Sequence, residues 1–365
     1  MIVFIFGTTA EAIKLAPIAR RLTAAGVPYE SWVTYQHTDS LKRLLPQLGF
    51  RPPTQVIANG RAGEPLRTRV DVIFWLFSII RWTLLRSRKL RKKLPRESLV
   101  VVHGDTMTSV VGALVAKFNR LPSAHVEAGL RSGNWRHPFP EELDRRIVGR
   151  LASIHYAPSE TAVSNLRRKG NVVFTHGNTV IDAVLDHAGR AEDEPDPFGL
   201  VLLHRFEFIS NQQLVEQTVR TLAKYSRLPL RVVVDAYSKR TMESVIGNAG
   251  AENIHTMPKL DHEGFVSLLR NAQFVITDSG GIQEETALLG TPTMVHRVAT
   301  ERAEGLDRNV RLSHWNQSEL AEFLTDYETL RHPIQRPEQS PSDIVVRDIL
   351  ARGIAPTGAE KSSNG

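Results

Sequence analysis

The chain has 365 residues, a hydrophobic content of 41% and no cysteine. This length is enough for two domains of roughly 150 residues each. The lack of cysteine excludes disulfides, thiolate nucleophiles and zinc-thiolate sites. The net charge of +7 favours an anionic ligand or surface, but no zinc finger or RNP-like aromatic motif accompanies it, so we expect no nucleic-acid partner.

The first predicted strand, residues 2–6, is apolar throughout, which is typical of a buried parallel strand. No charged region followed by a cleavable apolar segment precedes this strand, so we expect a cytoplasmic protein. A helix begins near Thr9, and the spacing of Thr8 and Glu11 fits either a capping box or a phosphate cradle at its N-terminus. No GxGxxG pattern follows the strand, so no nicotinamide cofactor is expected.

Residues 70–96 join an apolar stretch to a dense run of lysine and arginine. About 14 nearly continuous apolar residues are too few to span a bilayer, which takes roughly 20. One interpretation is a core helix with a solvated basic end. The alternative is a surface helix that brings Phe74, Trp75, Phe77 and Trp82 to an anionic membrane, which would make the protein membrane-associated.

Polar residues follow two neighbouring apolar strands between residues 99 and 131. The first strand leads into the motif HGDT at 103–106, and a short second strand leads into HVEAGLR at 125–131. The carboxyl ends of neighbouring parallel strands meet at one sheet edge, where such sheets bind ligands. We therefore expect Asp105 and Glu127 in one crevice, close to a helix that begins at Glu141.

The second half of the chain repeats the alternation of strands and helices. A strand at 200–203 leads into His204, a position more typical of a ligand contact than of a core residue. The strand at 274–277 leads into the motif DSGGIQEE at 278–285. Its two glycines let the backbone approach a pyrophosphate, and the helix that follows directs its positive end toward that charge. This pattern indicates nucleotide binding, with Glu285 placed to accept from ribose hydroxyls.

The motifs HGDT, HVEAGLR, PEE and DSGGIQEE together resemble those of the UDP-N-acetylglucosamine 2-epimerases, over the chain up to about residue 312. The resemblance implies an α/β protein of the glycosyltransferase-B (GT-B) fold, with two Rossmann-like domains facing across a cleft. The implied N-terminal domain is 1–174 and carries the catalytic carboxylates. The implied UDP-binding domain is 175–354, its last helix packs back on the first domain, and 355–365 is a disordered tail. The resemblance also implies a homodimer.

The resemblance further implies the residues of the site. The catalytic residues would be Asp105, Glu127, Glu141 and His204. The contacts to UDP or to the rest of the substrate would be Thr9, Lys14, Arg145, Arg205, Ser279, Gly280, Gly281, Glu285 and Arg302. No metal ion and no other cofactor is implied. Proximity of the carboxyl groups is expected to raise the pKa of at least one of them, so that it holds a proton near neutrality.

The implied reaction inverts C2 of UDP-N-acetylglucosamine by elimination of UDP and re-addition, or ends in hydrolysis to N-acetylmannosamine. The alternative is a GT-B glycosyltransferase that transfers a sugar from a UDP-sugar, such as UDP-N-acetylglucosamine, to an acceptor that can be lipid-linked. Thr9 and Phe206 stand where the family has arginines, which motivates this alternative. Retention of all four catalytic positions favours the epimerase, because transfer at C1 needs no acid and base at C2. A third hypothesis is a non-catalytic sensor of UDP-sugars.

Overall fold

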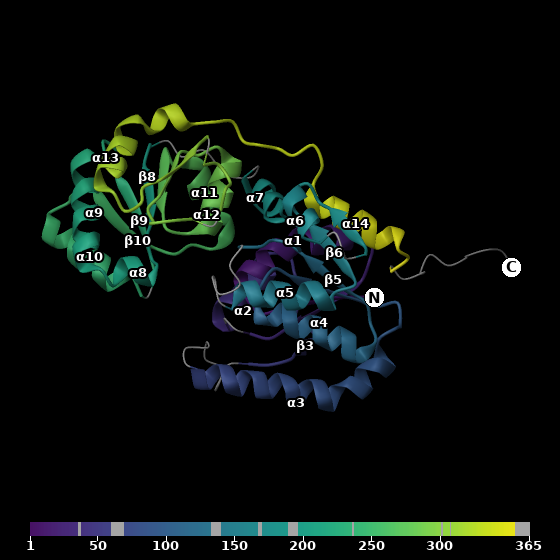
Figure 1. The fold of residues 1–365 in the computed structure, drawn as a ribbon. Coiled ribbons are helices and arrows are strands. Elements are labelled where there is room, and N and C mark those ends of the chain that lie inside the picture. Colours follow the sequence, from purple (N-terminus) through teal and green to yellow (C-terminus); the bar gives the residue numbers. More distant parts are fainter. Residues whose placement is uncertain are drawn as a thin grey trace. The chain divides into compact units, whose positions relative to one another are not determined.

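The chain divides into two units, each built around one parallel sheet (Figure 1). The computed structural model describes residues 1–35, 38–59, 69–132, 140–166, 170–188, 196–235, 237–300, 302–306 and 308–354. The first unit comprises Met1–Ala183 and the C-terminal segment from Pro337, and the second comprises Val184–Arg336. The expected domain division after residue 174 stays a prediction, and the expected disordered tail at 355–365 lies outside the described residues.

The first unit contains a seven-stranded sheet in the order β3-β2-β1-β4-β5-β6-β7, with every neighbouring pair parallel. The strands are β1 (Ile2–Phe6), β2 (Tyr29–Val33), β3 (Gln55–Val56), β4 (Leu99–His103), β5 (Ser123–Val126), β6 (Ile154–Ala157) and β7 (Val172–Phe174). All residues of β1 and β4 are buried, because helices cover both faces of the sheet. This burial explains why both strands are apolar throughout rather than alternating.

Alternate residues of β1 belong to two separate cores, one on each face of the sheet. Ile2, Phe4 and Phe6 pack with α1, α2 and α14, and Val3 and Ile5 pack with α3, α4 and α5. The helices of this unit are α1 (Thr9–Ala24), α2 (Thr38–Gln47), α3 (Arg69–Lys93), α4 (Met107–Asn119), α5 (Glu141–Leu151), α6 (Glu160–Asn165) and α14 (Pro341–Ala351), and α7 (Val180–Ala188) runs across the boundary. The last helix, α14, packs against α1.

Helix α3 covers one edge of the first unit and explains part of the apolar stretch found in the sequence. Trp75 is only 1% exposed, and its indole N–H donates to the carbonyl oxygen of Thr34 at 2.7 Å. The ring of Trp82 packs edge-on against Trp32, with ring centroids 5.7 Å apart. The hypothesis that Trp75 meets a membrane is therefore wrong, because its ring is buried, and the partly buried Trp82 packs against the core rather than facing outward. Among the described residues, no helix is long and apolar enough to cross a bilayer.

The second unit contains a six-stranded parallel sheet in the order β10-β9-β8-β11-β12-β13. The strands are β8 (Gly199–Leu202), β9 (Leu230–Val234), β10 (Ile254–Pro258), β11 (Phe274–Thr277), β12 (Thr293–Val295) and β13 (Val310–Leu312). The helical segments are α8 (Phe206–Ile209), α9 (Gln212–Tyr225), α10 (Lys239–Ala249), α11 (His262–Asn271), α12 (Gly280–Leu289), α13 (Gln317–Asp326) and η2 (Tyr327–Leu330). Two parallel sheets with alternating helices confirm the predicted α/β class.

Each sheet has one point at which the strand order reverses, between β1 and β4 in the first unit and between β8 and β11 in the second. Ligands of open parallel sheets bind outside the carboxyl ends of the strands at such a point. The loops that leave these strands begin at Gly7 and Gly104 in the first unit. In the second unit they begin at Leu203 and Asp278. The predicted motifs therefore follow the strands at which each sheet is expected to bind a ligand.

Two glycines that end helices in the second unit provide a matched pair for testing how closely its backbone is packed. Gly290 ends α12 with φ +70°, and a Cβ there would lie 2.0 Å from the carbonyl oxygen of His332. Gly250 ends α10 with φ +60°, and no atom lies within 4 Å of its Cβ position. We expect Gly290→Ala to lower the free energy of unfolding by about 2–4 kcal/mol, against about 1 kcal/mol for Gly250→Ala. Urea unfolding of both variants measures the difference, and equal losses would contradict the close packing at Gly290.

Candidate active site

Glu127 lies at the centre of the polar cluster in the first unit, directly after β5. Its side chain is 4% exposed, and Oε2 accepts hydrogen bonds from Lys14 Nζ, at 2.7 Å, and from Asn178 Nδ2. Its backbone has φ +64°, a left-handed conformation that costs a non-glycine residue about 1–2 kcal/mol. Such conformations persist where the surrounding structure enforces them and are typical of functional sites.

Arg145 connects Glu127 to the second predicted carboxylate, Asp105. It projects from α5 and forms an ion pair with Asp105 Oδ2, and its Nη1 lies 3.9 Å from Glu127 Oε1. Asp105 lies in the turn that follows β4. The structure therefore brings together Asp105, Glu127, Lys14 and Arg145, four of the residues expected from the sequence, around one sheet edge.

The N-terminal turn of α5 supplies two more carboxyl groups. Glu141 begins the helix, and Asp144 follows three residues later, so both lie on the helix face that also carries Arg145. Glu141 Oε2 and Asp144 Oδ2 are each buried and have no hydrogen-bond partner among the residues that the structure describes. Burial, together with the negative charges of Asp105 and Glu141, raises the pKa of Asp144 to about 7. The raised pKa was expected among the clustered carboxyl groups, but Asp144 was not among the predicted site residues, although its spacing from Glu141 is visible in the sequence.

The raised pKa of Asp144 makes the stability of the protein depend on pH. A carboxyl group whose pKa rises on folding makes its full contribution to stability below its pKa in the unfolded chain, near 3.8. This contribution is lost as the pH rises through its pKa in the folded protein, about 7. We expect Asp144→Asn to remove that loss, so that the variant gains about 1–3 kcal/mol relative to the original protein between pH 4 and pH 7.5. Urea unfolding at both pH values measures this gain. The exposed Glu160→Gln is the control, and a gain of the same size in both variants would contradict the assignment.

The histidines of the two motifs, His103 and His125, lie buried next to the carboxyl cluster. Burial lowers the pKa of His103 to about 3, and its Nε2 lies 3.7 Å from Glu127 Oε2. Burial likewise lowers the pKa of His125 to about 3, and its Nε2 lies 2.7 Å from the carbonyl oxygen of Gly104. Both rings are therefore neutral near pH 7. A neutral His125 with its proton on Nε2 donates to Gly104 and so shapes the turn that carries Asp105.

Glu11 links the loop after β1 to the loop after β4. Its Oε2 accepts from the backbone N–H groups of Gly7 and Thr8, at 3.0 and 2.9 Å, and its Oε1 accepts from Thr106 Oγ1 at 2.6 Å. Thr8 Oγ1 in turn accepts from the Glu11 N–H, which confirms the capping box. The amides of Gly7 and Thr8 bind this carboxylate, so these two donors do not serve a phosphate cradle here. Thr9 follows as the first residue of α1.

A histidine and a buried aspartate form the polar centre of the second unit. Asp278 follows β11 and is 1% exposed, and its Oδ2 accepts from the backbone N–H groups of His204 and Arg205, both at 2.8 Å. The Nδ1 atom of His204 lies 3.1 Å from Asp278 Oδ1. The carboxylate favours a proton on Nδ1, which leaves Nε2 of the 39% exposed ring to meet a ligand.

The N-terminus of α12 is the second polar feature of this unit. Ser279 precedes the helix, and no side chain caps its first turn. Gly281 is exposed, and a Cβ there would meet only Ser279 Oγ, at 3.8 Å. Packing within the unit therefore does not require glycine at this position. Uncapped N–H groups at a helix N-terminus bind anions, and a glycine there lets an anion approach the backbone.

The remaining residues of the DSGGIQEE motif hold the segment around Arg302. Gln283 Nε2 donates to the carbonyl oxygens of Arg302 and Glu304, at 3.2 and 3.1 Å. Glu284 lies 3.5 Å from Arg302 Nη1, and Glu285 lies 3.9 Å from His262 Nε2. Arg302 is therefore braced by this helix. Arg205, another predicted contact, forms an ion pair with Glu207 at 3.6 Å.

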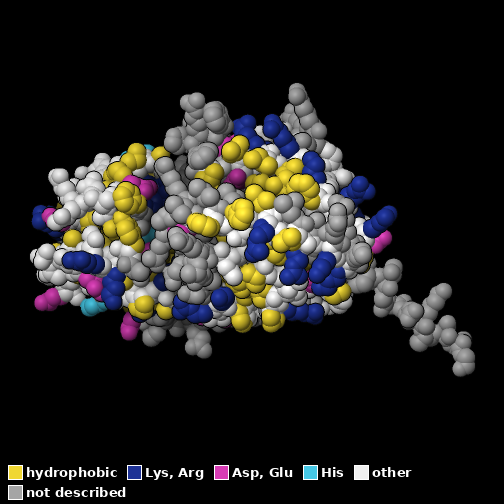
Figure 2. All heavy atoms as spheres, turned by 90° about the horizontal axis from the view of Figure 1, so that it is seen from below, with side chains coloured by type: hydrophobic (Ala, Val, Ile, Leu, Met, Phe, Trp, Pro, Cys, Tyr) yellow, Lys and Arg dark blue, Asp and Glu magenta, His cyan; other side chains and the backbone are white. Residues whose placement is uncertain are grey.

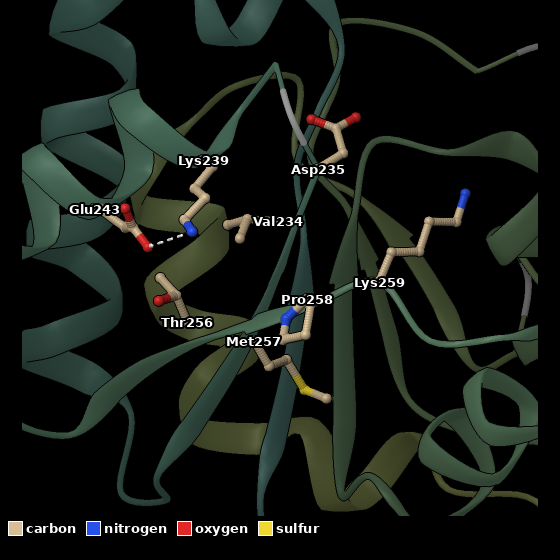
Figure 3. A pocket seen from close by; sticks show the side chains of 8 residues that line it. All are labelled: Val234, Asp235, Lys239, Glu243, Thr256, Met257, Pro258 and Lys259. Carbon is tan, nitrogen blue, oxygen red and sulfur yellow. Dashed lines mark ion pairs between the residues drawn. The ribbon is translucent and has the colours of Figure 1, made fainter.

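An open pocket of about 510 Å³ lies where β9 and β10 end, at a place that no sequence motif indicated (Figure 3). Its lining residues are Val234, Asp235, Lys239, Glu243, Thr256, Met257, Pro258 and Lys259. Burial acts to raise the pKa of Asp235, but hydrogen bonds from Ser238 and from the Tyr237 N–H outweigh burial and leave the pKa lowered. The pocket therefore combines charged side chains with the apolar Val234, Met257 and Pro258, at the carboxyl ends of β9 and β10. Within the described ranges, no group of three metal-ligating side chains could hold a metal ion.

Two doubly wound parallel units, one with clustered carboxyl groups and one with an uncapped helix N-terminus, define an α/β enzyme of the GT-B type. A model of the UDP-N-acetylglucosamine 2-epimerase family matches residues 83–340, and the chain belongs to this family.

Relatives of known name agree with this family. The UDP-N-acetylglucosamine 2-epimerase of Yersinia pestis is 32% identical over 361 residues, which cover 91% of this chain and 92% of the relative. The enzyme of the same name from Bacillus subtilis is 31% identical over 323 residues, covering 83% and 80%. The crystal structure of the Neisseria meningitidis UDP-GlcNAc 2-epimerase bound to UDP-GlcNAc has a TM-score of 0.77 at 25% identity, covering 96% of this chain and 99% of that one.

These similarities confirm the predicted family and the GT-B type of fold. They also support the epimerase over the glycosyltransferase, and so confirm the predicted class of enzyme, an isomerase acting on a nucleotide sugar. The roles of the individual site residues stay predictions.

Proposed function

We propose that this enzyme inverts C2 of UDP-N-acetylglucosamine by eliminating UDP and adding it back. In the first step a base removes the C2 proton while the C1–O bond to UDP breaks, which leaves a 2-acetamidoglucal. In the second step an acid protonates C2 on the opposite face while UDP bonds again to C1. The observation that carries the proposal is the carboxyl cluster of Asp105, Glu127, Glu141 and Asp144. In this cluster Glu127 and Asp105 pair with cations, and the pKa of Asp144 is raised to about 7.

The carboxyl groups differ in their surroundings, and this difference supports separate roles. Glu127 accepts from Lys14 and lies near Arg145, so two cations favour its ionised form and suit it to act as a base. Asp144 holds a proton near neutrality on the same helix face as Glu141, so the acid would come from the first turn of α5. Lys14 and Arg145 would then act by holding carboxylates, in addition to any contact with the substrate.

The second unit supplies groups suited to the leaving diphosphate. The uncapped N–H groups at Gly280 and Gly281, with the Ser279 hydroxyl, would hold its phosphate oxygens. His204, held by Asp278, would present Nε2 to the leaving oxygen and stabilise its charge. Glu285 would accept from the ribose hydroxyls. Arg205, Arg302 and Thr9 remain proposed contacts of the substrate.

The test is proton NMR of the purified enzyme with UDP-N-acetylglucosamine in deuterated water. We expect deuterium at C2 and a product of manno configuration, because the proton added at C2 comes from solvent. Glu127→Gln removes the proposed base and should slow this exchange by about 10²–10⁴-fold. The exposed Glu160→Gln on α6 is the matched control and should exchange at the original rate.

The released products distinguish the two forms of the reaction. Free UDP that accumulates with N-acetylmannosamine would indicate hydrolysis. A constant total amount of UDP-sugar without free UDP would indicate re-addition. A substrate that stays undeuterated and is consumed only with an added acceptor would contradict the proposal and identify a glycosyltransferase.

We further propose that the protein is a homodimer, which the family resemblance implies. Multi-angle light scattering of the purified protein should give twice the chain mass of 40.8 kDa. A mass of one chain at micromolar concentration would contradict this proposal.

A further inference from the structure

Helix α3 carries apolar side chains on two opposite sides, and only one side packs inside the first unit. Trp75 and Ile79 are buried against the sheet, 1% and 5% exposed, in the core that also contains Trp32. Phe77, Ile80 and Leu85 are 64%, 56% and 65% exposed. A surface helix of a globular protein normally carries polar residues on its outer side. An exposed apolar stripe of this kind therefore marks a contact surface.

The charges along α3 are almost all of one sign. Its 25 residues contain one acidic residue, Asp71, in the first turn. Arg81 is exposed among the apolar residues of the stripe, and Arg86 and Lys89 are exposed further along. Figure 2 looks onto this side of the first unit, and hydrophobic and Lys or Arg side chains lie next to one another there. The stripe is thus both apolar and basic.

We propose that this exposed stripe of α3 docks on an anionic lipid surface. Phe77, Ile80 and Leu85 would enter the boundary between headgroups and acyl chains, and Arg81 and Lys89 would bind the headgroups. Charge complementarity favours this occupant over a second copy of the chain. In a symmetric dimer the same surface meets itself, so the basic residues of both copies would gather in one contact. Trp75 and Trp82 are not part of this stripe, because their rings contact the rest of the first unit.

The test is flotation of the full chain with lipid vesicles. We expect the protein to float with vesicles that contain phosphatidylglycerol and to stay behind with pure phosphatidylcholine. High salt should weaken the binding, because the headgroup contribution is electrostatic. Combined Phe77→Ser, Ile80→Ser and Leu85→Ser changes should lower the bound fraction by about tenfold. The three side chains are exposed, so the variant should keep its melting temperature and its turnover of UDP-N-acetylglucosamine.

A second variant separates charge from apolar contact. Arg81→Glu with Lys89→Glu leaves the apolar stripe intact and should abolish the preference for phosphatidylglycerol. Tyr225→Ser on α9, a partly exposed aromatic of the other unit, is the control and should bind as the original protein does.

Three results would overturn the proposal. The first is an original protein that floats with neither kind of vesicle. The second is a triple variant that floats as well as the original. The third is a triple variant that changes from dimer to monomer in light scattering without lipid, which would assign the stripe to contact between two copies. None of these results bears on the epimerase reaction, which is followed separately by NMR.

Discussion

A buried negative charge must be compensated where it lies, and the first unit is organised around one such charge, on Glu127. Its partners are far apart in the chain. Lys14 comes from α1, Arg145 from α5, and Asn178 from the segment before α7. The hydrogen bonds and ion pairs of this carboxylate therefore connect the loop after β5 to α1, to α5 and to the segment before α7. Through Arg145 they also reach Asp105 in the loop after β4. The left-handed backbone of Glu127 is maintained because three separate segments bind its side chain.

The second unit compensates its buried carboxylate in another way. Asp278 accepts two backbone N–H groups from the loop after β8, so its charge is stabilised by the main chain and by the ring of His204. The two strands at the reversal of the sheet order are thereby joined at their carboxyl ends. The first unit thus combines carboxyl groups in different protonation states, and the second combines an oriented histidine with a helix N-terminus.

Helix α3 shows how one apolar segment can serve two surfaces. Its inner side completes the core between the sheet and α4, and Trp75 finds a hydrogen-bond partner there. Its outer side leaves Phe77 and Leu85 exposed beside basic residues. Core packing accounts for the first side alone. The proposed contact with an anionic lipid surface would account for the second side.

The sequence by itself determined the α/β class, the strand ends at which the motifs lie and the family. These features depend on local patterns, such as apolar β1 and β4 and the residues that follow them. Only the tertiary structure decided that the pKa of Asp144 rises to about 7, because this shift depends on burial and on Asp105, a residue from another segment. Tertiary structure also decided that the amides of Gly7 and Thr8 bind Glu11. A nearly continuous apolar run has no clear period, so only packing could separate the buried Trp75 from the exposed Phe77.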